Sequence, residues 1–168
     1  GDTTLTSFSL YLAGRFSGAG TLDLRGYVAE WDGEKAGSLL FASGTRTMNA
    51  NGDEQEFAFD TNNLELKAGS DYVFFLSVAA LPTQPASRFA LPGDADGSAI
   101  NGAFVFLNNE GNFDAVFDSA WSTSFAPRDA QFTATFDSIT PAAVPLPASL
   151  PLGLAAMGAL GLLARRRA

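Results

Sequence analysis

The sequence predicts an all-β protein, an antiparallel β-sandwich of the jelly-roll type, followed by a short C-terminal transmembrane helix. Apolar and polar residues alternate in several short segments of residues 1–139, and this period of two is typical of half-buried strands. Turns rich in Gly and Asn separate the segments, and no amphipathic helix pattern occurs between them. Because an apolar sheet face must be covered, we expect two packed sheets with most of the 15 phenylalanines between them.

The first two predicted strands are residues 5–12 and 21–31, in which apolar side chains recur at every second position. In the second segment Leu22, Leu24 and Val28 share one face. The opposite face carries Asp23, Arg25, Tyr27 and Trp31. We therefore expect the first of these faces to be buried and the second to be exposed.

A hairpin is predicted at Asp32-Gly33, since Gly accepts positive φ without steric cost, and residues 38–47 are the returning strand. The remaining strands are predicted at residues 55–61, 64–69, 71–81, 103–107 and 131–139. The run 71–81 is continuously apolar, as in a strand buried on both faces, and its β-branched and aromatic content favours a strand over a buried helix. In the last segment Phe132, Ala134 and Phe136 lie together on one face.

Two long stretches, residues 82–102 and 108–127, carry no strand signal, and loops of this length are often functional. The first contains oxygen ligands of the kind that Ca²⁺ binds. They are Asp94, Asp96, Ser98 and Asn101. Gly97 comes too early for an EF-hand, and clusters of Asp and Gly also form ordinary solvated turns. Calcium at Asp94, Asp96 and Asn101 is the one cofactor that we consider, and a solvated loop is the alternative.

Charge is distributed unevenly along the chain. Without the three arginines of the tail, 7 of the 10 basic residues remain in the body against all 18 acidic ones, a net charge of −11. Such a body repels phosphate backbones, so we expect no nucleic acid partner. The sequence has no Cys and no His, which excludes disulfides, thiolate nucleophiles and Ser-His-Asp catalysis. No starting Met or secretory leader precedes Gly1, so we expect that a leader was removed or that the sequence is a fragment.

The tail predicts a short membrane helix. Residues 148–164 carry no charge and would form a helix about 25 Å long, which is at the lower limit for a bilayer. Three arginines, Arg165, Arg166 and Arg167, follow it and would stay in the cytoplasm, leaving the acidic body outside. A buried C-terminal helix is the alternative, but terminal arginines and a proline-rich linker fit it badly. We therefore divide the chain into an exported β-sandwich domain (1–139), a proline-rich linker (140–147) and an apolar C-terminal helix with its arginine cluster (148–168).

The tail also resembles a known family of signals. Val144, Pro145, Leu146, Pro147 and Ala148 form a proline motif, and an apolar span and the arginine cluster follow in order. This resembles the PEP-CTERM sorting signal of the VPLPA type, found in Gram-negative bacteria that produce exopolysaccharide. The resemblance implies that an exosortase recognises the motif and removes the tail, so that the mature form ends near Pro147. Proline suits this role because it keeps the segment extended and accessible to an enzyme groove.

The body offers two further kinds of site. The first is an exposed aromatic strip that stacks on a saccharide, formed by Tyr27 and Trp31 on the polar face of their strand and joined by Trp121. Alternatively, the Trp31 ring folds over the edge of the core. Glycoside hydrolysis needs two carboxylates. Glu30, Glu110, Asp114 and Asp118 are the available candidates. Any acidic protein offers such pairs, so this pattern is not specific.

From these observations we expect an exported cell-surface or extracellular-matrix protein that is not an enzyme and that binds polysaccharide. The expected partners are an exosortase-type enzyme, the inner membrane for a time, and exopolysaccharide. The body also resembles the jelly-roll domains that often accompany such sorting signals. The alternatives are a secreted hydrolase of matrix polysaccharide and a purely structural matrix component.

Overall fold

The computed structural model describes residues 4–15, 20–49, 51–81, 88–90, 93–94, 102–123 and 129–137. The predicted linker, sorting motif and arginine cluster lie outside these residues. In the described part of the chain, no helix is long and apolar enough to cross a membrane.

The described residues form antiparallel strands and one short helix, which confirms the predicted all-β antiparallel class. The first six strands are β1 (Thr4–Arg15), β2 (Thr21–Trp31), β3 (Ala36–Ala42), β4 (Arg46–Asn49), β5 (Glu54–Glu65) and β6 (Tyr72–Ser77). The remaining elements are β7 (Arg88–Ala90), β8 (Gly93–Asp94), α1 (Ala115–Asp118), β9 (Asp129–Ala130) and β10 (Phe132–Asp137).

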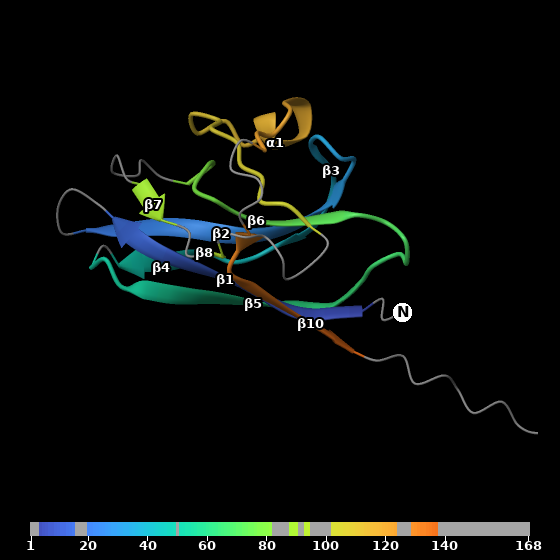
Figure 1. Cartoon of the computed structure of the whole chain (residues 1–168), viewed down its shortest axis with the longest axis horizontal. Coiled ribbons are helices and arrows are strands. Elements are labelled where there is room, and N and C mark those ends of the chain that lie inside the picture. The colour runs from blue at the N-terminus through green and yellow to red at the C-terminus, as the bar shows by residue number, and fades with distance from the viewer. Residues whose placement is uncertain are drawn as a thin grey trace, which may run out of the picture.

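Two sheets make up the main body. In the first sheet β1 lies between β10 and β5, and β7 pairs with the end of β1. In the second sheet β2 pairs with β3, β4 and β6. Figure 1 shows β5, β1 and β10 side by side beneath β2 and β6. A small pair, β8 and β9, leads into β10.

The two sheets share one buried cluster, which we call the central core. Strands β1 and β5 of the first sheet supply Phe8 and Phe59, whose rings stack at a centroid distance of 5.0 Å. Strand β2 supplies Leu22, Leu24 and Val28, the face that the alternation predicted to be buried. Among the described residues, the buried members of this cluster are Leu5, Phe8, Leu10, Leu12, Leu22, Leu24, Val28, Met48, Phe57, Phe59 and Leu66.

A third layer covers the outer face of the second sheet. Residues 102–123, which we call the covering segment, include α1 and pack on β2, β3 and β6 (Figure 1). A second buried cluster forms beneath it: Tyr27, Ala29, Ala36, Val73, Phe75, Val116 and Trp121. Strand β6 therefore has apolar contacts on both faces, as its continuous apolar run predicted, because Val73 and Phe75 join this cluster while Phe74 packs on the central core.

Most predicted strands are present, but several bounds differ. The returning strand 38–47 is two strands, β3 and β4, which both pair with β2. Residues 64–69 are not a separate strand, since β5 ends at Glu65 and a turn follows. Residues 103–107 are not a strand either, and form one isolated bridge between Phe106 and Ser122. The side chains of Val105 and Leu107 pack on the second cluster instead of extending a sheet.

Candidate functional site

Trp31 lies at the end of β2, between two adjoining pockets. Its backbone N–H donates a hydrogen bond to the carbonyl of Asp71 at 3.0 Å, which ties the end of β2 to the start of β6. Its half-buried ring meets the ring of Trp121 edge to face at a centroid distance of 5.6 Å. One side of the indole is therefore supported by the second cluster, and the rest faces the pockets.

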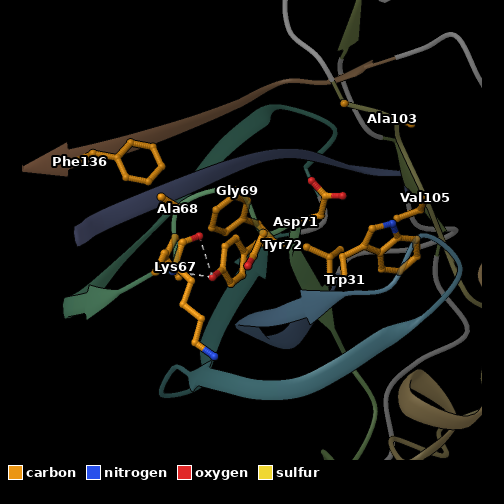
Figure 2. A pocket seen from close by; sticks show the side chains of 14 residues that line it. Trp31, Lys67, Ala68, Gly69, Asp71, Tyr72, Ala103, Val105 and Phe136 are labelled. Atoms are coloured by element: carbon orange, nitrogen blue, oxygen red, sulfur yellow. Dashed lines mark hydrogen bonds between the residues drawn. The ribbon is translucent and has the colours of Figure 1, made fainter. Parts of the chain in front are cut away.

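The larger pocket has a volume of about 630 Å³ and lies between the turn that precedes β6, the covering segment and β10. Figure 2 shows Asp71 between Tyr72 and Trp31, with Val105 beside the indole and Phe136 on the opposite side of the view. Most of the lining side chains are apolar or aromatic. The pocket can therefore hold a ligand with an apolar ring face, and Asp71 offers it a hydrogen-bond acceptor.

The smaller pocket, of about 310 Å³, adjoins the first and is more polar. Its lining residues are Glu30, Trp31, Asp32, Gly37, Ser70 and Asp71. Trp31, Ser70 and Asp71 line both pockets, so they form the common wall. We call the two pockets and this wall the Trp31 site.

Two turns hold the polar residues of the Trp31 site. In the hairpin after β2, Asp32 Oδ1 accepts the backbone N–H groups of Glu34 at 2.8 Å and Lys35 at 2.7 Å. These two hydrogen bonds lower the pKa of the Asp32 carboxyl because they stabilise its charged form, and the bond from Lys35 has the larger effect. Gly33 has a φ of +100° there, as the predicted hairpin turn requires.

The second turn comes before β6. The Lys67 backbone N–H donates to the Tyr72 hydroxyl oxygen at 2.7 Å, and the Ser70 N–H donates to the Lys67 carbonyl at 3.3 Å. Figure 2 shows the contacts between Lys67 and the Tyr72 hydroxyl on the side of Tyr72 away from Trp31. The turn thus presents Ser70 and Asp71 beside the indole without using their side chains in its own hydrogen bonds.

The charge of the Trp31 site is negative. Glu30, Asp32 and Asp71 line the smaller pocket, and among the described residues that line either pocket Lys67 alone is basic. In the described part of the chain no group of three or more Asp, Glu, His or Cys side chains is arranged to hold a metal ion. The chemistry of the site is therefore an aromatic face beside hydrogen-bond acceptors, which suits a ring-shaped ligand rich in hydroxyl groups.

The structure gathers the three aromatic residues of the predicted strip at the second cluster, but it buries two of them. Tyr27 is only 4% exposed and stacks on Phe75 at 5.1 Å, and Trp121 is 8% exposed. The prediction that they are exposed is wrong, because the covering segment buries that face of β2. Only Trp31 reaches a pocket, and the alternative in which it folds over the edge of a core is partly correct, since it also packs on Trp121.

The four candidate carboxylates are not brought together at this site. Glu30 lines the smaller pocket, whereas Glu110, Asp114 and Asp118 belong to the covering segment and line neither pocket. Of the proposed calcium ligands, Asp94 lies in β8, where only the backbone is described, and Asp96 and Asn101 lie outside the described residues.

Sequence reasoning missed Ser70 and Asp71 as site residues, since it placed Ser70 between two predicted strands and Asp71 at the start of the strand 71–81. The sequence Lys67-Ala68-Gly69-Ser70-Asp71 does contain a turn signal at Gly69, whose φ is +78°. Their proximity to Trp31 depends on the pairing of β2 with β6. Comparison with protein-family models, with curated proteins and with solved structures finds no match for the chain.

Proposed function

We propose that this chain is an exported protein of the cell surface or extracellular matrix, sorted through its C-terminal signal. The support is the order of three parts in residues 144–168: the proline motif, the uncharged apolar span and the arginine cluster. An apolar span followed by arginines halts translocation and leaves the acidic body beyond the inner membrane. An exosortase then cuts near the motif Val144–Ala148 and releases the body to the envelope or matrix.

Intact-mass analysis tests the sorting proposal. The exported form is expected to lack Arg165, Arg166 and Arg167 and to end near Pro147, whereas a strain without the sorting enzyme retains the whole tail. A matched variant, Pro145→Ala with Pro147→Ala, changes the motif and leaves the apolar span and the arginines intact. Exported protein that still carries the three arginines would contradict the proposal.

For the body we propose a β-sandwich of the jelly-roll type that binds polysaccharide without cleaving it. The main support for saccharide binding is the position of Trp31. Its side chain is half-buried in the common wall of two pockets and is flanked by Ser70 and Asp71. Indole faces stack on sugar rings, and carboxylates and hydroxyls accept or donate to sugar hydroxyls. Lys67 is the one basic side chain among the described residues of the site, which favours neutral sugars over uronic acids, since the carboxylates of uronic acids would meet those of Glu30, Asp32 and Asp71.

Affinity electrophoresis in a gel that contains the exopolysaccharide of the expressing strain tests the binding proposal. The parent body is expected to be retarded without shortening the polymer, and Trp31→Ala is expected to weaken retardation roughly tenfold, about 1.4 kcal/mol. Leu39→Ala is the matched control, because Leu39 is 42% exposed and lines neither pocket. Release of reducing ends would favour the hydrolase alternative. Unretarded parent protein would favour a structural matrix component.

A further inference from the structure

One edge of the first sheet carries exposed aromatic side chains. Strand β10 pairs with β1 on one side, and among the described residues no strand pairs with Phe132–Asp137 on the other. Phe132 is 36% exposed and Phe136 is 41% exposed. With Leu39, they are the large apolar residues that the structure leaves most open to solvent within its described part.

Strand β5 forms the opposite edge of the same sheet, and charges and a local distortion protect it against pairing with another chain. Strand β5 presents exposed Glu54, Glu56 and Asp60, and its Asn62 and Asn63 adopt positive φ, which distorts the strand. Charges and local distortions prevent edge strands from pairing with other chains. Strand β10 has no Lys, Pro or Gly, and its one charge, Asp137, lies at the end. By this contrast β10 is the edge that is open to pairing.

The hydrogen bonds of β10 show which of its backbone groups point outward. The Tyr11 N–H donates to the Gln131 carbonyl at 3.3 Å, and the Thr6 hydroxyl donates to the Thr135 carbonyl at 3.0 Å. Backbone groups alternate in direction along an antiparallel strand, so the odd-numbered residues of this strand face β1. The N–H and C=O groups of Phe132, Ala134 and Phe136 therefore face the free edge.

We propose that a second copy of this chain pairs with this edge, β10 against β10, in an antiparallel register centred on Ala134. In this register Phe132 lies opposite Phe136 of the partner subunit, and the two-fold symmetry repeats this pair. Thr133 lies opposite the partner's Thr135. Asp137 falls opposite Gln131, so no like charges meet. Two Phe pairs across the strands are favourable contacts, and the result is a two-fold symmetric dimer with one continuous sheet.

The charge distribution of the chain explains why a second copy would bind at the β10 edge. The whole chain has a net charge of −8, so two copies repel one another over most of their surfaces. Strand β10 offers six residues with a single terminal charge, and its outward backbone groups match those of an identical antiparallel strand. Since Phe136 also lines the larger pocket, Phe132 of the partner subunit would lie at the rim of the Trp31 site.

Disulfide trapping tests the register, because the chain has no Cys of its own. Thr133 and Thr135 are exposed on the outer face of β10. In the proposed register they form a non-hydrogen-bonded pair about 4.5 Å apart at Cα, which a disulfide can bridge. Full-length Thr133→Cys and Thr135→Cys proteins are mixed and oxidised. We expect about tenfold more covalent dimer from the mixture than from either variant alone, since like positions lie about 7–8 Å apart.

A matched control separates edge pairing from association through the tail. Ala58→Cys places a thiol at an exposed position of β5, the protected edge, and is expected to give only background crosslinking. Crosslinking of either single variant above this background would mean a shifted register and overturn the register proposed here. A mixture that crosslinks no better than Ala58→Cys would overturn the dimer itself, and would leave the edge to an extended segment of another protein.

Charge substitution gives an independent measurement of the same pairing. Phe132→Lys with Phe136→Lys places Lys opposite Lys twice, whereas Phe132→Glu with Phe136→Lys places Glu opposite Lys twice. Sedimentation of the full chain is expected to show loss of the dimer in the first variant and its recovery in the second. Equal masses for the two variants would overturn the proposal, since both replace the same aromatic residues.

Discussion

The ring of Phe59 lies directly against the backbone of Gly26. A Cβ atom at position 26 would come within 2.7 Å of Phe59 Cε2, closer than real Cβ contacts allow. The ring has no free space to move into, because Phe59 is 1% exposed and stacks on Phe8 at 5.0 Å. Gly26 in the second sheet therefore sets how closely the two sheets approach.

Gly26→Ala is thus expected to destabilise the body by about 1–3 kcal/mol, the usual cost of overpacking a core. Gly44→Ala is the control, since nothing lies within 4 Å of the added methyl group there. Chemical denaturation of both variants gives the comparison. Equal midpoints would show that the core can relax around position 26.

The alternation of β2 predicted one of its faces correctly and the other wrongly, for a definite reason. Period-two spacing tells which side chains share a face, and Leu22, Leu24 and Val28 are indeed buried together. It does not tell whether a third layer covers the opposite face. Tyr27 is buried there by the covering segment, whose own sequence has no regular period and was predicted to be a loop and a strand.

The candidate site was predictable only in part. The sequence singled out Trp31 and the Asp32-Gly33 hairpin because both carry local signals. Ser70 and Asp71 reach Trp31 only through the pairing of β2 with β6, in which Glu30 lies opposite Tyr72. That pairing joins residues about forty positions apart, and local patterns do not specify such long-range partners.

Asp32 is expected to give the hairpin a stability that depends on pH. Its folded-state pKa is lowered by the N–H groups of Lys35 and Glu34. The contribution is therefore complete above the ordinary value of 3.8 and is lost as the pH falls through the lower folded-state pKa. Asp32→Ala should be less stable than the parent near neutral pH, and the difference should shrink in strong acid.

Asp32→Asn is the control for this prediction. Its amide oxygen can still accept both backbone N–H groups but does not titrate in this range. Thermal melts between neutral pH and strong acid should show the pH-dependent difference from the parent for both variants, with Asp32→Asn more stable than Asp32→Ala at neutral pH. A difference between the parent and Asp32→Ala that is constant down to strong acid would contradict the assigned hydrogen bonds.

Trp121 is expected to stabilise the Trp31 site through its contact with the Trp31 ring. Its indole N–H donates to the Val116 carbonyl at 3.0 Å, and its backbone N–H donates to the Glu34 carbonyl at 2.9 Å. Trp121→Phe keeps the backbone bond but leaves the Val116 carbonyl without its indole donor, at a cost of about 1–3 kcal/mol. The variant should be less stable in urea, with the proposed saccharide binding weakened less than in Trp31→Ala. Unchanged stability would show that the indole bond contributes little.

Tyr27 is expected to act on stability and not on ligand contact. Its ring is 4% exposed, stacks on Phe75 at 5.1 Å and tilts against Phe113 at 4.8 Å. Tyr27→Ala removes both contacts and leaves a cavity beneath the covering segment, so a loss of about 3–5 kcal/mol is expected. Tyr27→Phe keeps the ring and should unfold close to the parent. If Tyr27→Ala remained as stable as Tyr27→Phe but lost binding to the polymer, Tyr27 would have to be exposed, and the placement of the covering segment over β2 would be wrong.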